Sequence, residues 1–312
     1  MINPYTYSQI NDGFRCQLEQ ETAGWCRYSI DFPSAQSLPY LGSIRVLGEY
    51  LSPKNAGRRP LVILVHGMGD RSIRPCRLIA RTLAKNGFAS FILYLVFHTV
   101  RAPDSIKRKY PRLTAEEWFE SYQISVTDIR QVVDWAGTRP EIDQNQISVV
   151  GISFGGFVAS IAMGLDKRIN AGILVVSGGN SDKITKNSLM LRWSYKHDRA
   201  EYQRNQESYA RYLAEVDEKG FENVMPGKTS YWTDPKTFSV FLRSRPVMML
   251  NALWDEMIPK SSTLDLWDAY GKPPIIWYPA THASIWLWYP WMGKRIVKFL
   301  RANSAIKGKS AN

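Results

Sequence analysis

The sequence predicts an α/β fold in which helices cover both faces of a doubly wound, mostly parallel sheet. Short aliphatic and β-branched runs, such as 61–65 and 173–176, are typical of strands buried on both faces. Segments with helical spacing of apolar residues, such as 118–136, lie between these runs. From residue 61 onward the two kinds of segment alternate, which is the pattern of repeated strand–helix–strand units with right-handed crossovers.

The individual elements follow from the same two patterns. The expected strands are apolar runs, and they cover 25–32, 43–51, 61–65, 88–97, 146–150, 173–176, 246–253 and 274–278. The expected helices show apolar residues three and four positions apart, and they cover 76–86, 118–136, 157–165, 263–270 and 292–302. Gly87 follows the first of these helices as a typical C-terminal cap.

Residues 180–244 break the alternation because they are polar, charged and rich in tyrosine, with a helical stretch over 199–216. We interpret them as a helical cap inserted between two parts of one α/β core, 1–179 and 245–312. The cap would cover the active site and determine the substrate. Its aromatic residues favour a substrate with a hydrophobic or aromatic group.

The 312 residues are 45% hydrophobic and carry a formal net charge of +12. Basic residues cluster at 101–112 and again at Lys307 and Lys309. Such charge suits an anionic partner, such as nucleic acid, a membrane surface or an acidic substrate, or a basic face in contact with solvent. No nucleic-acid-binding motif accompanies it, so we expect the solvated face and no nucleic-acid partner.

No apolar stretch is long enough to span a bilayer, and the first residues lack the pattern of a signal peptide. The expectation is a cytoplasmic protein without an integral membrane segment; the oligomeric state is left open. Cys16, Cys26 and Cys76 show no metal-ligand spacing. Three free thiols are expected, with a Cys16–Cys26 disulfide as the alternative.

The strongest chemical signal is the G-x-S-x-G pentad from Gly151 to Gly155, which lies between an expected strand and an expected helix. This context predicts a nucleophile elbow, in which a tight strand-to-helix turn lifts the oxygen of Ser153 clear of the sheet. The alternative is a glycine-rich turn with an incidental serine. A serine hydroxyl needs a base to take its proton.

The chain has four histidines, His66, His98, His197 and His282, so the base can be sought by elimination. Strand-to-helix elbows of this type use the chain order serine, acid, histidine. His282 is the one histidine after Ser153 that follows an expected strand. We therefore expect it to be the general base.

The third member must be a carboxylate at the end of a strand between the other two. Asp255 fits this requirement and would accept the imidazole N–H, fixing its tautomer. Glu256, next to it, is expected to point elsewhere, and Asp182 is the rival position. The oxyanion hole needs two donors, for which the backbone N–H groups of Phe154 and Met68 are the candidates.

Together, residues 66–69, the pentad around Ser153, Trp254–Asp255 and Thr281–His282 resemble the α/β-hydrolase superfamily. The segment from Arg139 into the elbow is similar to its dienelactone-hydrolase and prolyl-oligopeptidase-like esterase branch. The resemblance implies an eight-stranded sheet, no cofactor and no metal, and acyl transfer to water through an acyl-serine. The chain lacks a cysteine nucleophile and an N-terminal propeller, which favours ester over peptide hydrolysis.

Three further residues are candidate substrate contacts. His98 ends an expected strand on the active-site edge, and Trp254 and Trp286 flank the acid and the histidine. Structural roles in a loop or in the core are the alternatives, and the aromatic run over 277–291 also suits an interfacial contact. The function indicated is a serine esterase acting on a small-molecule ester. A serine peptidase or amidase, or a non-catalytic hydrolase-like binding protein, is the alternative.

Overall fold

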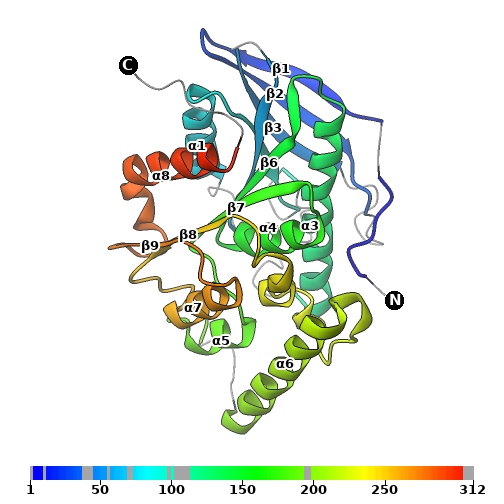
Figure 1. The fold of residues 1–312 in the computed structure, drawn as a ribbon, viewed down its shortest axis with the longest axis vertical. Helices are drawn as coiled ribbons and strands as arrows, with labels where there is room; N and C mark the ends of the chain where they lie inside the picture. Colours follow the sequence, from blue (N-terminus) through cyan, green and yellow to red (C-terminus); the bar gives the residue numbers. More distant parts are fainter. Residues whose placement is uncertain are drawn as a thin grey trace.

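The computed structural model confirms the doubly wound, mostly parallel sheet (Figure 1). It describes residues 3–9, 12–36, 45–54, 57–68, 73–96, 100–101, 113–192 and 198–304. The strands are extended runs, and their bounds are β1 Arg15–Glu21, β2 Trp25–Pro33, β3 Arg45–Pro53, β4 Arg59–Val65, β5 Ala89–Tyr94, β6 Ile142–Ile152, β7 Ile169–Val175, β8 Val247–Ala252 and β9 Ile275–Tyr278.

These strands form one sheet in the order β1-β2-β3-β5-β4-β6-β7-β8-β9. The pairs from β4 to β9 are parallel, whereas β1, β2 and β3 pair antiparallel with their neighbours. The sheet therefore has nine strands in the described part of the chain, not the expected eight. The additional strand is β1, whose seven residues are all exposed and carry no apolar run that would have predicted it.

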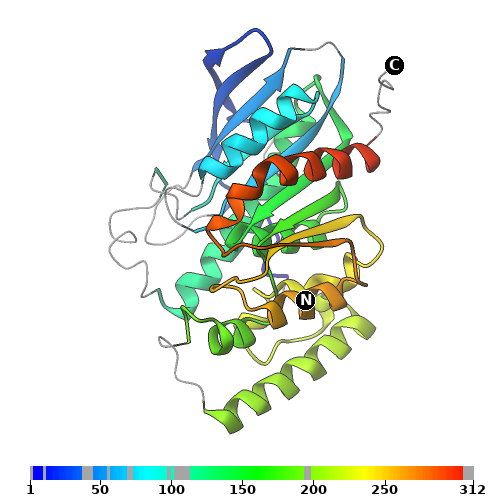
Figure 2. The same ribbon diagram turned by 90° about the vertical axis from the view of Figure 1, so that its left-hand side faces the viewer.

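Helices cover the two faces of the sheet. The α-helices are α1 Ile73–Lys85, α3 Ala115–Gly137, α4 Phe154–Leu165, α5 Ser181–Asn187, α6 Arg199–Lys219, α7 Lys260–Ala269 and α8 Tyr289–Ala302. Side chains of α1 and α8 share one buried cluster, and those of α3, α4 and α6 share another on the opposite face. Figure 2 shows α1 and α8 side by side on their face. No helix of the described residues is long and apolar enough to cross a membrane.

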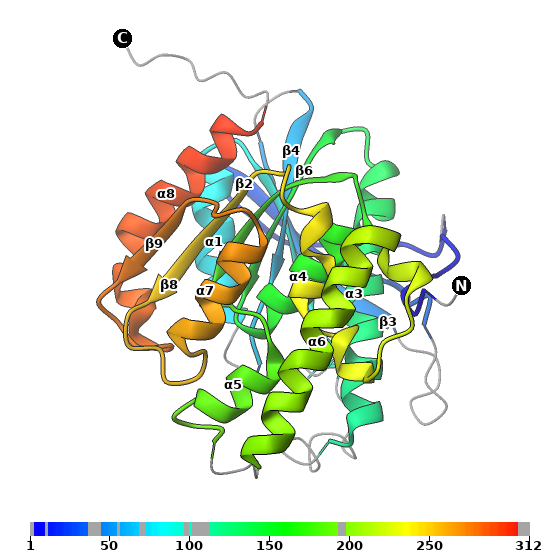
Figure 3. The same cartoon turned by 60° about the horizontal axis from the view of Figure 1, so that its bottom comes forward.

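The segment predicted as a cap lies between β7 and β8. It contains α5, α6 and three short 3-10 helices, η2 Phe221–Asn223, η3 Thr229–Tyr231 and η4 Pro235–Phe241. Figure 3 shows α5 and α6 on the face that carries α4 and α7. Gly164 of α4 lies so close to η4 that a Cβ there would be 2.8 Å from Cβ of Phe238. The segment thus packs directly on the core, and the domain boundaries stay a prediction.

The aromatic residues of this segment do not gather over the active site as expected. Tyr209, Tyr212 and Tyr231 are buried in the main core cluster, where their rings lie 4.6–6.4 Å apart. Trp232 stacks on Phe119 of α3. Trp193 and Tyr195 lie outside the described residues. Most of the described tyrosines therefore attach the segment to the core, and they give no information on a substrate.

The cysteine alternative is decided in favour of free thiols. Cys16, Cys26 and Cys76 are all unpaired. Cys76 is buried in α1, and burial raises the pKa of its thiol.

A buried carboxylate joins four elements at the antiparallel end of the sheet. Glu49 of β3 pairs with Arg27 of β2 and Arg77 of α1, and accepts a hydrogen bond of 2.6 Å from the Tyr94 hydroxyl at the end of β5. Burial acts to raise the pKa of Glu49, but the hydrogen bonds from Arg77 and Tyr94 outweigh it and lower that pKa below its ordinary value. The carboxylate is thus stabilised in its charged form.

Replacing this carboxylate should destabilise the fold in a pH-dependent way. We expect Glu49→Gln to lower the free energy of unfolding by roughly 1–3 kcal/mol at neutral pH, because buried donors lose a charged acceptor. Because the folded pKa is lowered, the stabilisation is present above the unfolded pKa of about 4.3 and is lost as pH falls through the folded value.

Urea unfolding at neutral pH and at pH values below about 4 would measure this effect. The difference in the free energy of unfolding between the wild type and Glu49→Gln should become smaller on acidification. Glu218→Gln, on the exposed side of α6, is the matched control and should change little at either pH. A difference in the free energy of unfolding that stays constant over the whole pH range would contradict the role of the Glu49 charge.

Candidate active site

The predicted elbow is present between β6 and α4. Ser153 has φ of 53° and ψ of −120°, a conformation that L-residues rarely adopt. The neighbouring glycines permit the turn. A Cβ at Gly155 would lie 2.3 Å from the carbonyl oxygen of Val65, and one at Gly151 would lie 2.4 Å from the carbonyl oxygen of Gly155. Any side chain at these two positions would therefore force the turn apart.

The structure brings Ser153, His282 and Asp255 together in one hydrogen-bonded chain. Nε2 of His282 lies 2.9 Å from Oγ of Ser153, and Nδ1 lies 2.9 Å from both carboxylate oxygens of Asp255. The His282 side chain is 17% exposed and that of Asp255 is 6% exposed. The arrangement can move a proton from the hydroxyl to the imidazole while the carboxylate stabilises the imidazolium.

The carboxylate beside His282 belongs to Asp255, and the rival Asp182 lies in the first turn of α5 without a contact to the histidine. Asp255 follows β8. Its Oδ1 accepts hydrogen bonds from the backbone N–H groups of Met257 and Ile258, at 2.9 and 2.7 Å. These bonds hold the carboxylate in place, as in an Asx-turn.

The loop after β4 lies against the serine. A Cβ at Gly67 would be 3.2 Å from Cβ of Ser153 and 3.8 Å from its Oγ. His66 is buried beside it, and its Nε2 accepts a hydrogen bond of 3.0 Å from the Leu95 N–H. Nδ1 therefore carries the hydrogen and donates it to the Gly67 carbonyl oxygen at 2.6 Å.

This tautomer sets the direction of the next N–H group. The Gly67 carbonyl and the Met68 N–H belong to one planar trans peptide, so they point in opposite directions. With the carbonyl held by His66, the Met68 N–H is turned away from that ring. The Met68 side chain is exposed, whereas the Phe154 side chain is buried against Tyr122, with ring centroids 5.1 Å apart. The backbone of both oxyanion candidates is therefore held in place, by the hydrogen bond to the Gly67 carbonyl oxygen for Met68 and by side-chain packing for Phe154.

Glu256 contacts the histidine turn, contrary to the expectation that it points elsewhere. Its Oε2 accepts the backbone N–H of His282 at 3.0 Å. Its own backbone carbonyl accepts the Ser188 hydroxyl at 3.0 Å and the Met190 N–H at 3.2 Å. The residue therefore links the acid turn, the histidine turn and the segment after α5. Its position next to Asp255 was the one signal available in the sequence.

The three candidate substrate contacts are placed differently. His98 lies outside the described residues. Trp254 is 64% exposed beside Asp255, where a substrate can reach it. Trp286 is half-buried and packs against the cluster under α1 and α8, in agreement with the structural alternative. Arg101, near His98 in the chain, pairs with buried Asp128 at 2.8 Å.

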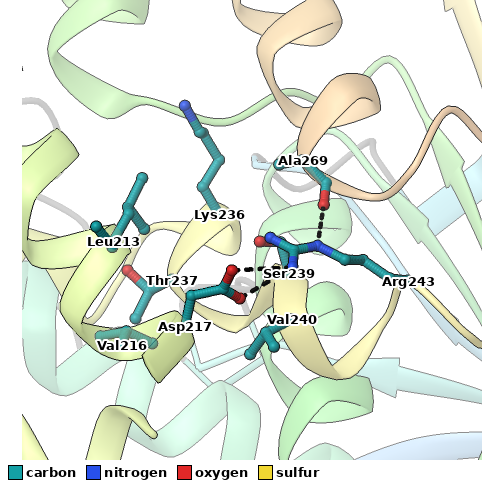
Figure 4. A pocket seen from close by; sticks show the side chains of 10 residues that line it. Leu213, Val216, Asp217, Lys236, Thr237, Ser239, Val240, Arg243 and Ala269 are labelled. Atoms are coloured by element: carbon teal, nitrogen blue, oxygen red, sulfur yellow. Dashed lines mark hydrogen bonds and ion pairs between the residues drawn. The ribbon is translucent and has the colours of Figure 1, made fainter. Parts of the chain in front are cut away.

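One pocket of the described residues lies away from this site. It has a volume of about 200 Å³ and lies between α6, η4 and the end of α7, and none of Ser153, Asp255 and His282 lines it. Figure 4 shows Arg243 reaching across this pocket to the carboxylate of Asp217, with a second hydrogen bond to the carbonyl oxygen of Ala269. Its polar groups satisfy one another. Across the described ranges, no cluster of histidine, cysteine and carboxylate side chains is arranged to hold a metal ion.

Comparisons with known proteins agree with this fold. The model of the family described as alpha/beta hydrolase domain containing 18 matches residues 31–300. Among curated proteins, an uncharacterized Mycobacterium tuberculosis protein, MT2702, is 24% identical over 161 residues, covering 51% of this chain and 33% of that protein. The uncharacterized Pseudomonas aeruginosa protein PA2218 is 28% identical over 152 residues, covering 46% of this chain and 38% of that protein. The matches span little more than a third of these relatives.

Solved structures resemble nearly the whole chain. An acetyl xylan esterase from Paenibacillus sp. R4 has a TM-score of 0.63 at 18% identity, covering 93% of this chain and 89% of that one. Acetyl xylan esterase 1 from Thermoanaerobacterium sp. JW/SL YS485 has the same TM-score and coverages at 15% identity. The structure of PA2218 has a TM-score of 0.59 at 18% identity, covering 93% and 99%. Such low identities show a shared fold and nothing further.

Proposed function

We propose that this chain, which belongs to the family described as alpha/beta hydrolase domain containing 18, is a serine hydrolase that cleaves carboxylic esters. The observation that carries the proposal is the contact of 2.9 Å between Nε2 of His282 and Oγ of Ser153, on an elbow with φ of 53°. The esterase names of several structural neighbours support an ester as the bond cleaved. The substrate proposed is a small-molecule ester.

In the proposed reaction Ser153 is the nucleophile and His282 is the general base. Oγ attacks the acyl carbon while its proton passes to Nε2 of His282, and Asp255 stabilises the imidazolium. The carbonyl oxygen becomes an oxyanion that accepts the N–H groups of Met68 and Phe154. Collapse of this oxyanion breaks the bond to the alkoxide, which takes the proton from the imidazolium and departs as the alcohol. The acyl group stays bound to Oγ of Ser153.

The second half of the reaction releases the acid. A water molecule replaces the alcohol and passes a proton to Nε2 of His282, and its oxygen attacks the acyl carbon. Collapse of the second oxyanion breaks the bond to Oγ, which recovers its proton from the imidazolium. The fixed Gly67 carbonyl keeps the Met68 N–H oriented through both steps, so the donor needs no reorganisation in either.

Replacing the nucleophile tests the proposal most directly. We expect Ser153→Ala to lower kcat for a p-nitrophenyl ester by about 10³-fold or more, because no other group forms the acyl intermediate. The variant should remain folded, and it should no longer be labelled by a fluorophosphonate probe that labels the wild type. Ser160→Ala, on the same helix, should keep both properties. Full activity in Ser153→Ala would refute the assignment.

Glu256 is proposed as a positioning residue that holds the main chain of His282. We expect Glu256→Ala to lower kcat by roughly ten- to a hundredfold with little change in KM, because the imidazole would lose its alignment with Ser153. Glu256→Gln should recover most of the activity, since an amide oxygen can accept the same N–H.

The pH profile separates this hydrogen bond from the charge of Glu256. Activity of the wild type should rise with pH in one ionisation as His282 loses its proton. Glu256→Gln removes the negative charge while keeping the acceptor, so the plateau of its pH profile should stay near that of the wild type. If Gln at this position were as inactive as Ala, the charge and not the hydrogen bond would be responsible.

The bond preference can be measured with matched substrates. We expect p-nitrophenyl esters to be hydrolysed with kcat/KM at least about a hundredfold above that of the corresponding p-nitroanilides, because several structural neighbours carry the name of esterases. A series of acyl chain lengths would then show which acyl group the site accepts. Faster cleavage of the anilides would favour a serine amidase on the same residues.

A further inference from the structure

Two helices on one face of the sheet carry basic but no acidic side chains. α1 carries Arg74, Arg77, Arg81 and Lys85, and α8 carries Lys294, Arg295, Lys298 and Arg301, while neither helix has an acidic residue. By contrast, the 21 residues of α6 mix acidic and basic side chains. A solvated surface usually intersperses the two signs, because like charges repel one another.

These charges are available to a partner. Arg77 is neutralised by Glu49, but the other seven side chains are exposed and have no carboxylate within ion-pairing distance among the described residues. Their spacing places them in stripes. On α1 the stripe runs Arg74, Leu78, Arg81, Lys85, and on α8 it runs Trp291, Lys294, Lys298, Arg301. Residues three and four apart lie on one face of a helix.

The two stripes are neighbours. The Tyr289 hydroxyl at the start of α8 donates to the Leu78 carbonyl oxygen and contacts the Thr82 hydroxyl, at 3.0 and 2.6 Å. Arg301 near the end of α8 donates to Asn86, just after α1. A groove of about 490 Å³ runs between the helices and is lined by Lys294, Lys298 and Arg301. Figure 2 shows both helices on the outer face of the sheet.

Large apolar side chains are exposed at one end of this basic face. Leu78 is 39% exposed, Trp291 is 56% exposed and Leu287 is 79% exposed. The hydrogen bond from the Tyr289 hydroxyl to the Leu78 carbonyl oxygen places Leu78 beside the start of α8, which carries Trp291 and directly follows Leu287 and Trp288. Tryptophan next to leucine and lysine is the composition of segments that lie in a bilayer interface.

We propose that the face formed by α1 and α8 docks on the surface of a membrane that contains anionic phospholipids. The seven unpaired basic side chains would contact phosphate headgroups, and Leu78, Leu287 and Trp291 would enter the interface. A nucleic acid would also satisfy the charges, but it offers no apolar environment to the two leucines. The docking surface is independent of the ester chemistry proposed above.

Vesicle co-sedimentation tests the docking. The wild type should bind vesicles of an equal mixture of phosphatidylcholine and phosphatidylglycerol, and binding should fall with added salt and be absent on pure phosphatidylcholine. Lys294→Glu with Lys298→Glu should weaken binding at least about tenfold, because two favourable headgroup contacts become repulsive. Leu287→Ser should weaken binding while the salt dependence remains.

A control of equal charge keeps the test specific. Arg204→Glu with Arg211→Glu makes the same charge change on α6, where both side chains are exposed, and should leave vesicle binding unchanged. Thermal unfolding would establish that every variant is folded without reference to activity.

Four results would overturn the proposal. Two concern the wild type, namely equal binding to pure phosphatidylcholine and no binding to either vesicle. The third is an equal loss of vesicle binding in the α6 control. The fourth is tight binding of duplex DNA that Lys294→Glu with Lys298→Glu abolishes, in a protein that does not bind vesicles.

Discussion

The left-handed conformation of Ser153 is the constraint on which the rest of the site depends. Such a backbone costs energy of order 1–3 kcal/mol, so the surroundings must enforce it. The N–H of Ser153 donates to the Val175 carbonyl at 2.8 Å, and Gly155 lies directly against the carbonyl oxygen of Val65. The central strands therefore clamp the elbow from both sides. This is why the turn needs glycine where a side chain would collide, and why the serine oxygen points out of the sheet.

Further unusual backbone lies at the same edge of the sheet. Val176, directly after β7, has φ of 45°, which is rare for a β-branched residue, and its N–H donates to the Leu250 carbonyl of β8. Asn180, which caps α5, has φ of 62°. A sheet whose strands are fully buried can hold such residues, since core packing on both faces outweighs their cost.

The sequence predicted the parallel strands and the three hydrogen-bonded residues because their signals are local. Ser153 sits in a pentad between two apolar runs, and only one histidine followed it after a strand. The features that the sequence did not predict depend on contacts between residues distant in the chain. β1 pairs through its backbone while its side chains face solvent, so no pattern marks it. Tyr209 and Tyr212 are polar-tipped residues whose burial depends on helices distant in the chain. The contact of Glu256 with His282 depends on how two turns meet, which spacing alone does not specify.

The position of Glu256 also bears on how substrate selection and chemistry are connected. Its carboxylate holds the His282 N–H, and its carbonyl holds Ser188 and Met190, which follow α5. Beside these contacts, Phe157 of α4, Ile184 of α5 and Ile258 of the acid turn form a small apolar cluster. The segment after α5 therefore cannot shift far without breaking bonds to the residue that aligns the histidine. A substrate that displaces this segment would disturb the proposed base. A substrate that fits beneath the segment would leave the base aligned. The same contacts would therefore favour both the binding of such a substrate and its turnover.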